Sequence, residues 1–340
     1  MRTLIKLFYI LLTALCLISC NEQKTDVSSN AFKLKEVELA QIADKINSDF
    51  VAVRKQVELF ASFAKMIYEN RENLKQGLKN SKYELYQDTV YYKTEDDGGS
   101  AVFVSGIIPV GDKIKERVRF TEVFDLFMIP VVSIYPEIVQ AYVNDYESYN
   151  RIYPWFDVLS QYEHKIDISA FNFYFLADEK HNPKKKGVWV DEPYVDPAGR
   201  GWMISAIAPV YLDGVLECVP GLDITINIIA DRYIAKSDKQ YMLVAKTGLI
   251  VTTTEDAARI LSLPPLTDHR YIETVKSDTY KPDEFNLLKS KNKNTRAVAE
   301  KLINQNESFC SLTSGEKKYT LLSAPIKELG WRLLEIIEEK

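Results

Sequence analysis

The stretch Val188–Ile226, VWVDEPYVDPAGRGWMISAIAPVYLDGVLECVPGLDITI, decides the fold class of this chain. β-Branched and aromatic residues recur in it between Gly, Pro and Asp, which predicts a strand, a turn and two long apolar strands. It also contains two conspicuous carboxylates: Asp196 follows the first strand, and Asp223 lies inside a mainly apolar run where a lone acid is unexpected. These two acids are therefore the first candidates for a functional site.

The first twenty residues predict a targeting segment that is not part of the fold. Basic residues flank the start of an apolar run, residues 7–18, which is shorter than the ~20 residues that a membrane-spanning helix needs. The run ends in LISC (residues 17–20), which resembles the lipobox of bacterial lipoproteins, where the Cys is acylated and becomes the mature N-terminus. We therefore expect residues 1–19 to be a lipoprotein signal peptide and Cys20 to carry lipid. The alternative is an ordinary secreted protein.

Composition limits the classes that remain. A chain of 340 residues with 46% hydrophobic residues predicts a sizeable core, in two domains or in one domain with a large extension. The net charge of −5, with both signs interleaved, argues against a nucleic-acid partner, which requires a basic stripe. Beyond the signal peptide and Cys20 only Cys218 and Cys310 remain. We expect two separate buried thiols, although an oxidising compartment permits a disulfide between them.

The pattern divides the mature chain into four parts. A polar tether at 20–35 leads into a long helix at 36–80, where apolar residues recur at spacings of three and four. Alternating patterns then predict a first unit at 81–238 and a second at 239–340, giving an α+β fold with antiparallel sheets. In the first unit, strands are expected at 86–93, 101–109, 138–146 and 170–177. Helices are expected there at 113–135, broken at Pro130 and Pro136, and at 228–238, and a loop leading into a short helix is expected at 149–161. In the second unit, strands are expected at 241–245, 249–253, 308–312, 319–324 and 331–337.

Motifs for common chemistries are absent from the sequence. The three histidines share no metal-ligand spacing, and there is no HExxH, CxxC, GxSxG, P-loop or GxGxxG motif. We therefore expect no metal, no cofactor and no enzymatic activity. The one enzymatic hypothesis with a residue basis is a hydrolase that uses Asp196 and Asp223 as an acid/base pair, as in glycosidases.

Four motifs, together with the long helix, resemble the double Cache sensor domain family. They are PWF (154–156), PYVDPAGRGW (193–202), GLDITI (221–226) and GWRLLEII (330–337). The resemblance covers residues 36–340. It implies one long helix followed by two PAS-like units with antiparallel sheets, of which the membrane-distal unit binds a small molecule outside the cytoplasm.

The amino-acid-sensing branch of that family suggests ligand-binding residues. This branch carries an Arg two residues before a Trp-Tyr pair, then a Tyr and an Asp, and later a second Asp; these groups hold the ligand's carboxylate and ammonium. The resemblance assigns ligand-binding roles to Trp155, Tyr194, Asp196 and Asp223.

The sequence departs from that pattern at two positions. Phe156 stands where the Tyr is expected, and Tyr153 stands where the Arg is expected, so the fixed cation is missing. A pocket that keeps two carboxylates and several aromatic rings favours a cationic group. Arg151, two residues before Tyr153, would restore amino-acid binding if its side chain turned into the pocket, and both possibilities stay open. The predicted ligand-binding residues are therefore Arg151, Tyr153, Trp155, Phe156, Tyr194, Asp196 and Asp223.

The resemblance and the lipobox together imply a lipid-anchored sensor in the bacterial cell envelope, facing the periplasm or the exterior. Its ligand is expected to be a small polar metabolite, an amine or an amino acid. Because no output module follows the second unit, we expect a separate membrane protein, such as a histidine kinase, a diguanylate cyclase or a chemoreceptor in chemotaxis, to receive the signal. A lipoprotein that delivers a solute to a transporter is the alternative.

Overall fold

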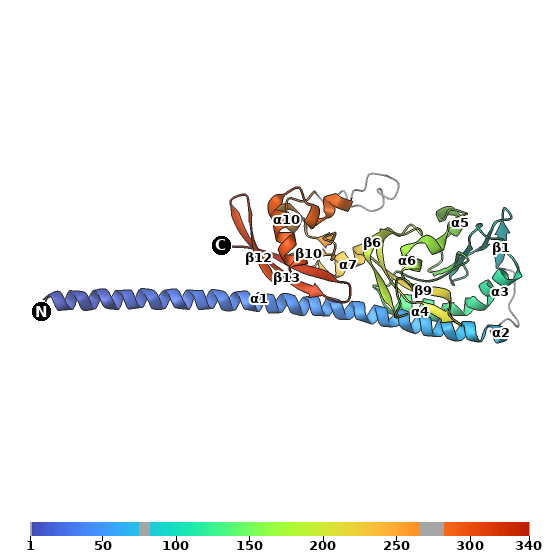
Figure 1. Ribbon diagram of the computed structural model, residues 1–340, viewed down its shortest axis with the longest axis horizontal. Coiled ribbons are helices and arrows are strands. Elements are labelled where there is room, and N and C mark those ends of the chain that lie inside the picture. Colours follow the sequence, from blue (N-terminus) through green and yellow to red (C-terminus); the bar gives the residue numbers. More distant parts are fainter. Residues whose placement is uncertain (1, 75–81, 265–281, 340) are drawn as a thin grey trace.

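The computed structural model describes residues 2–74, 82–264 and 282–339, which form one long helix and two antiparallel sheets (Figure 1). The helix, α1 (Arg2–Glu69), runs along both sheets, which lie one after the other beside it. This arrangement confirms the predicted α+β class, with a long helix followed by two units that are each built on an antiparallel sheet.

The long helix differs from its predicted bounds. It ends at Glu69 and is followed by the short helix α2 (Arg71–Leu74), while residues 75–81 lie outside the described part of the chain. Its backbone is helical through residues 20–35, without a break where the tether was expected. The division into signal peptide, tether and helix therefore stays a prediction.

The larger sheet belongs to the distal unit, farther from the N-terminus of α1 (Figure 1). Its strand order is β1-β2-β3-β5-β4-β9-β7-β6, and β8 pairs with β9. Its strands are β1 (Tyr83–Tyr86), β2 (Val90–Lys93), β3 (Ala101–Val104), β4 (Gln140–Asp145), β5 (Tyr149–Tyr153), β6 (Val188–Val195), β7 (Trp202–Ile207), β8 (Val210–Leu212) and β9 (Val215–Thr225).

Three sequence predictions in this unit were wrong. The strand expected at 86–93 is a hairpin, because Gln87 and Asp88 adopt positive φ and turn the chain between β1 and β2. The strand expected at 170–177 forms the end of the 3-10 helix η2 (Ile168–Ala170) and the helix α6 (Asn172–Phe175), although its aromatic residues favour strands. The loop expected at 149–161 begins with β5, and only its helix, α5 (Val158–Gln161), was predicted correctly.

The helix expected at 113–135 forms three consecutive elements. These are α3 (Asp112–Phe120), the 3-10 helix η1 (Thr121–Phe124) and α4 (Asp125–Ile134). Pro130 lies inside α4 and does not end it. The helix ends at Ile134, two residues before Pro136, which agrees with the steric bias of a Pro against helical conformation in the residue that precedes it.

The proximal unit contains the five strands that the sequence predicted. Its sheet has the order β11-β10-β14-β13-β12 and follows the helix α7 (Ile226–Tyr233). The strands are β10 (Gln240–Val244), β11 (Ile250–Thr253), β12 (Phe309–Ser314), β13 (Lys317–Ile326) and β14 (Trp331–Glu338), and the helical elements are α8 (Glu255–Ile260), η4 (Pro282–Phe285), η5 (Leu287–Lys289), α10 (Lys293–Ala299) and the π-helix η6 (Glu300–Asn304). Residues 265–281 lie outside the described part.

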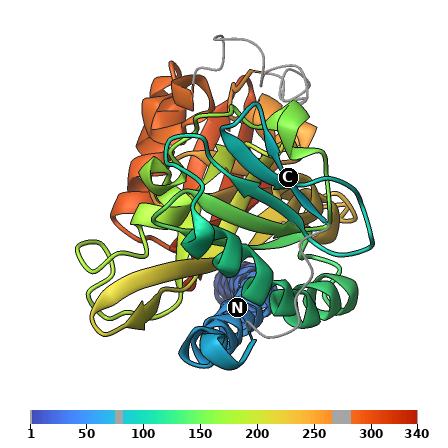
Figure 2. The same cartoon turned by 90° about the vertical axis from the view of Figure 1, so that its right-hand side faces the viewer.

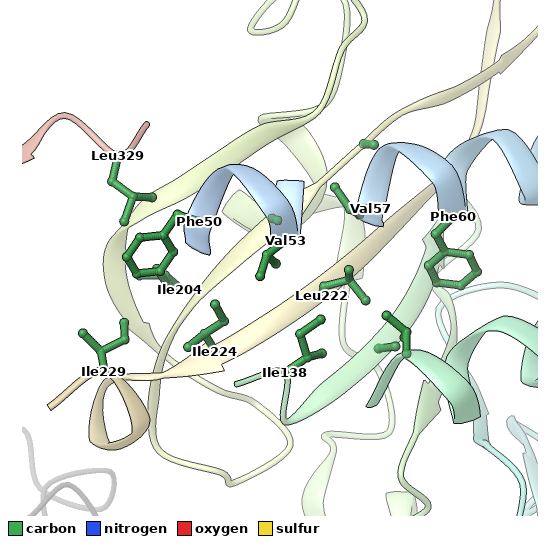
Figure 3. Packing of buried hydrophobic residues seen from close by; sticks show 14 of the residues in the cluster. Phe50, Val53, Val57, Phe60, Ile138, Ile204, Leu222, Ile224, Ile229 and Leu329 are labelled. Atoms are coloured by element: carbon green, nitrogen blue, oxygen red, sulfur yellow. The ribbon is translucent and has the colours of Figure 1, made fainter. Parts of the chain in front are cut away.

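The apolar face of α1 packs into a core that it shares with both sheets. Figure 3 shows Val53 and Val57 of α1 near Leu222 and Ile224 of β9, and Phe50 of α1 beside Leu329 of the β13–β14 turn. The ring of Phe50 lies 5.5 Å from that of Trp189 in β6 and 5.8 Å from that of Trp331 in β14. One aromatic side chain therefore contacts both sheets.

Two further observations concern cysteines and membrane spans. Cys218 and Cys310 are buried free thiols, as the sequence led us to expect. Within the part of the chain that the structure describes, no helix combines the length and the apolar character that crossing a bilayer requires.

The position of Phe50 gives a stability prediction. We expect Phe50→Ala to lower the free energy of unfolding by about 3–5 kcal/mol, because it removes a buried ring from the core that α1 shares with both sheets. Leu59→Ala, on the same helix at a side chain that is 56% exposed, should change it by less than about 0.5 kcal/mol. Urea denaturation of both variants measures the difference, and equal losses would contradict the shared core.

Candidate ligand-binding site

A pocket lies on the face of the distal sheet that points away from α1. Figure 2, which views the distal end, shows α1 on the other side of this sheet. The space in the pocket that the centre of a water molecule can reach is about 30 Å³, within about 390 Å³ of non-atom space that includes open solvent. It is lined by Gln140, Tyr142, Asn144, Asn150, Ile152, Tyr162, Ile166, Ile168, Phe173, Tyr194, Asp196, Pro197 and Asp223.

Strand alternation decides which side chains line it. In β4, Gln140, Tyr142 and Asn144 line the pocket, whereas Ala141 and Val143 belong to the core around α1. The same alternation applies to β9, where Asp223 lines the pocket and its neighbours in sequence pack in that core. The polar residues of these central strands are thus gathered on one buried face.

A glycine in β9 makes room for the Tyr142 ring. A Cβ added at Gly221 would lie only 2.1 Å from Cζ of Tyr142. The ring therefore lies directly against the backbone of β9 and forms part of the pocket wall. Any side chain at position 221 would displace it.

Asp223 is the most deeply buried acid of the pocket, with 1% of its surface exposed. Ser205 Oγ donates a hydrogen bond to Oδ1, and Gln140 Nε2 donates to Oδ2. Burial and the nearby charge of Asp196 raise the pKa of Asp223 to about 8, and the two hydrogen bonds only partly oppose this shift. The Asp223 carboxyl is therefore mostly protonated at neutral pH.

Asp196 begins the loop that follows β6. Its carboxylate accepts backbone hydrogen bonds from Ala198 N (2.9 Å) and Arg200 N (3.2 Å), and Gly199 turns the loop with a φ of +81°. Burial raises the pKa of Asp196, while these two hydrogen bonds act in the opposite direction. The acid thus shapes its own loop as well as lining the pocket.

The tyrosines of the pocket are neutral hydroxyl groups. Burial and the charge of Asp223 raise the pKa values of Tyr142 and Tyr194, and burial and the charge of Asp196 raise that of Tyr162. The hydroxyl of Tyr194 lies 2.5 Å from Ser205 Oγ, which extends the hydrogen-bond network of Asp223.

Three of the seven predicted ligand-binding residues, Tyr194, Asp196 and Asp223, line the pocket. Arg151 does not, because it points to the opposite face of the sheet. Its guanidinium is fully buried there and donates to Tyr149 Oη (2.9 Å), Ser100 Oγ (2.8 Å), Tyr83 Oη (3.3 Å) and the carbonyl of Val118 (2.6 Å). Its neighbours Asn150 and Ile152 face the pocket instead.

The remaining three predicted residues also lie outside the lining. Tyr153 packs against the core around α1. Trp155 and Phe156 pack against the apolar cluster that surrounds the pocket, and the ring of Phe156 lies 5.4 Å from that of Tyr162. These two residues therefore belong to the apolar surroundings of the pocket and not to its lining.

Sequence reasoning missed the amides that line the pocket. Gln140 and Asn144 alternate with apolar residues in a strand that was predicted at 138–146, so they were accessible to an alternation argument. Asn150 was missed because its strand, β5, was read as a loop.

The lining contains two carboxylates and, among its described residues, neither Lys nor Arg. Arg200 lies near enough for its charge to lower the pKa of both acids, but its guanidinium donates to the carbonyls of Pro154 (3.3 Å) and Val139 (3.5 Å). The pocket is therefore an acidic site. In the described ranges no cluster of His, Cys, Asp and Glu is suited to a metal ion.

Solved structures share this architecture. The extracellular domain of mmHK1S-Z2, named as a histidine kinase, matches with a TM-score of 0.53 and 11% identity over 91% of this chain and 97% of its own. That of mmHK1S-Z3, also named as a histidine kinase, matches with a TM-score of 0.51 and 12% identity over 91% of this chain and 94% of its own. The chain has the double Cache fold. The ligand-binding domain of the Pseudomonas fluorescens chemoreceptor CtaA, in complex with L-isoleucine, matches at 0.46 and 14% identity over 88% of this chain and 93% of its own. No family model and no curated protein matches the sequence.

The raised pKa of Asp223 gives this double Cache chain a distinctive pH dependence. An unfolded Asp titrates near pH 3.9, so between about pH 4 and pH 8 the folded state binds more protons and loses stability as pH rises. Asp223→Asn removes this contribution. We expect the variant to gain thermal stability relative to the parent between pH 5 and pH 8, as measured by melting temperatures. Asp213→Asn, at an exposed turn between β8 and β9, is the matched control and should track the parent.

Proposed function

We propose that this pocket binds a small molecule through a cationic amine, and that the chain is an extracytoplasmic sensor domain without catalytic activity. The observation that carries the proposal is the pair of buried acids, Asp196 and Asp223, in a lining that has no cation among its described residues. A buried acid pair whose nearest cation, Arg200, lies outside the lining favours an ammonium group in the pocket, which supplies both a charge and hydrogen-bond donors.

The amine explains the state of Asp223. Without a cation, burial and Asp196 keep Asp223 mostly protonated at neutral pH. An ammonium group in the pocket favours the ionised forms of both acids, so its binding releases a proton. Gln140 Oε1, which is buried without a hydrogen-bond partner within the described structure, provides a further acceptor for the same group.

The position of Arg151 favours an amine over an amino acid. The resemblance to amino-acid sensors gives an Arg the role of holding the ligand carboxylate. Here Arg151 is hydrogen-bonded on the opposite face of the sheet, and no other lining residue that the structure describes carries a positive charge. A ligand carboxylate beside Asp196 and Asp223 would face two acids with no Lys or Arg among the described lining residues.

The fold neighbours support a sensing role. Two are extracellular domains of proteins named as histidine kinases, and one is the ligand-binding domain of a chemoreceptor. We infer that this chain likewise reports ligand binding, through a separate membrane-bound kinase, cyclase or chemoreceptor. The LISC segment supports lipid attachment at Cys20 and a location at the cell envelope, facing the periplasm or the exterior.

Amine binding should depend steeply on pH. Because Asp223 must ionise with a pKa of about 8 while an alkylammonium stays charged, affinity should rise about tenfold from pH 6 to pH 7 and level off above pH 8. Titration calorimetry with a series of primary alkylamines measures it. Asp223→Asn should weaken binding by at least about 30-fold and remove the pH dependence, whereas Asp213→Asn should change neither.

Titration with amino acids and an assay of glycoside turnover separate the amine sensor from two alternatives. Strong binding of amino acids but not of amines would sink the amine proposal. Turnover of a glycoside, abolished by both Asp196→Ala and Asp223→Ala, would instead establish the hydrolase.

Lipid attachment has its own test. In bacteria that express the full chain, Cys20→Ser should abolish incorporation of labelled fatty acid and release the protein from the membrane fraction, because the anchor depends on the acylated thiol. Cys16→Ser, which lies within the apolar run, should leave both unchanged. Membrane retention of the Cys20 variant would contradict the lipid anchor.

A further inference from the structure

A buried amide nitrogen at the far end of the pocket, Asn144 Nδ2, lacks a hydrogen-bond acceptor among the described residues. Asn144 is only 1% exposed, lines the pocket and lies four residues along β4 from Gln140. At the rise of an antiparallel strand, this spacing puts their Cα atoms about 13 Å apart. Asn144 and the Gln140–Asp223 pair therefore come from different ends of the pocket wall.

A chain of hydrogen bonds orients the Asn144 amide. Tyr162 Oη donates to Asn150 Oδ1 (3.3 Å), so the Asn150 nitrogen is the atom that faces Asn144 and donates to its Oδ1 (2.7 Å). This leaves Asn144 Nδ2 buried, with no acceptor among the described residues. A buried donor of this kind costs free energy until an acceptor is supplied.

The two ends of the pocket have opposite hydrogen-bonding character. At the acidic end Gln140 Nε2 donates to Asp223, which leaves Gln140 Oε1 as an unpaired acceptor. At the other end Asn144 Nδ2 is an unpaired donor. The lining also contains the apolar side chains of Ile152 and Phe173, which suit methylene groups and offer no charge.

We propose that Asn144 determines specificity by donating a hydrogen bond to a neutral acceptor at the second end of the ligand. This inference rests on the proposed function, in which an ammonium group binds at Asp223. The ligand class is then a linear molecule with an ammonium group, a short apolar linker and a neutral ether, hydroxyl or carbonyl oxygen. An α-amino acid fits poorly, because its carboxylate adjoins the ammonium group and lies beside the acids.

Matched pairs of amines test the proposal. Each pair contains an ω-methoxyalkylamine with three to six methylene groups and the alkylamine with the same number of heavy atoms, so the two differ by one ether oxygen in place of a methylene. Titration calorimetry at pH 8 on the full mature chain measures the affinity ratio. At the linker length that places the ether oxygen next to Asn144 Nδ2, the ether should bind at least as tightly as the alkylamine of the same length. An ether oxygen buried without a hydrogen bond would instead make the ether bind more weakly than that alkylamine.

Two variants assign the effect to Asn144. Asn144→Leu, which keeps the branched shape and the number of heavy side-chain atoms, should weaken the ether by about two- to twelvefold relative to the alkylamine, which corresponds to one net hydrogen bond. Asn144→Asp keeps the acceptor for Asn150 and replaces the donor with an acid, so it should shift preference towards α,ω-diamines. Because Asn144→Asp hardly changes the shape of the side chain, its effect on ligand preference does not depend on a packing defect of the kind that Asn144→Leu could introduce.

Failure of the amine site and failure of the role of Asn144 give different results. If no amine binds at any length, both the proposed function and this inference are overturned. If alkylamines bind through Asp223 but every ether binds more weakly than its isostere, or if both Asn144 variants leave the ratio unchanged, the amine site stands and the role of Asn144 is refuted.

Discussion

The packing of one apolar face of α1 against both sheets is the constraint on which the rest of the structure depends. It buries one face of the distal sheet under α1, with α4 beside it, and so leaves the other face for a pocket (Figure 2). Strand alternation then assigns every residue of β4, β5 and β9 to one face or the other. The placement of Asp223 in the pocket and of Arg151 behind the sheet both follow from this division.

The same division explains what the sequence could and could not predict. Helical periodicity identified α1 from residue 36 to its end, and Gly-punctuated strands identified the proximal sheet, because both signals are local. Asp223 stood out as an acid in an apolar run, whereas uncharged Asn144 did not. The position of Arg151 outside the lining has a different cause: reading 149–161 as a loop ignored strand alternation, which places residue 151 on the face opposite that of Asn150 and Ile152.

The strand that supplies part of the pocket also contacts the proximal unit. Asp191 of β6 pairs with Lys246 (2.6 Å), and its carbonyl accepts from Trp331 Nε1 (3.0 Å). Trp189 Nε1 donates to Glu328 of the β13–β14 turn, which also pairs with Arg54 of α1. β6 leads into the Asp196 loop and contacts both the proximal sheet and α1. It is therefore a direct physical connection between the pocket and the part of the chain nearer the N-terminus of α1.

The central claim is that two buried acids receive a cationic group. A crystal structure of the mature chain with a bound primary amine tests it most directly. The account expects the amine nitrogen within about 2.7–3.2 Å of an Asp223 carboxylate oxygen, with Gln140 Oε1 also in hydrogen-bond range. A ligand whose nitrogen lies away from Asp223, or whose anionic group occupies that position, would contradict it.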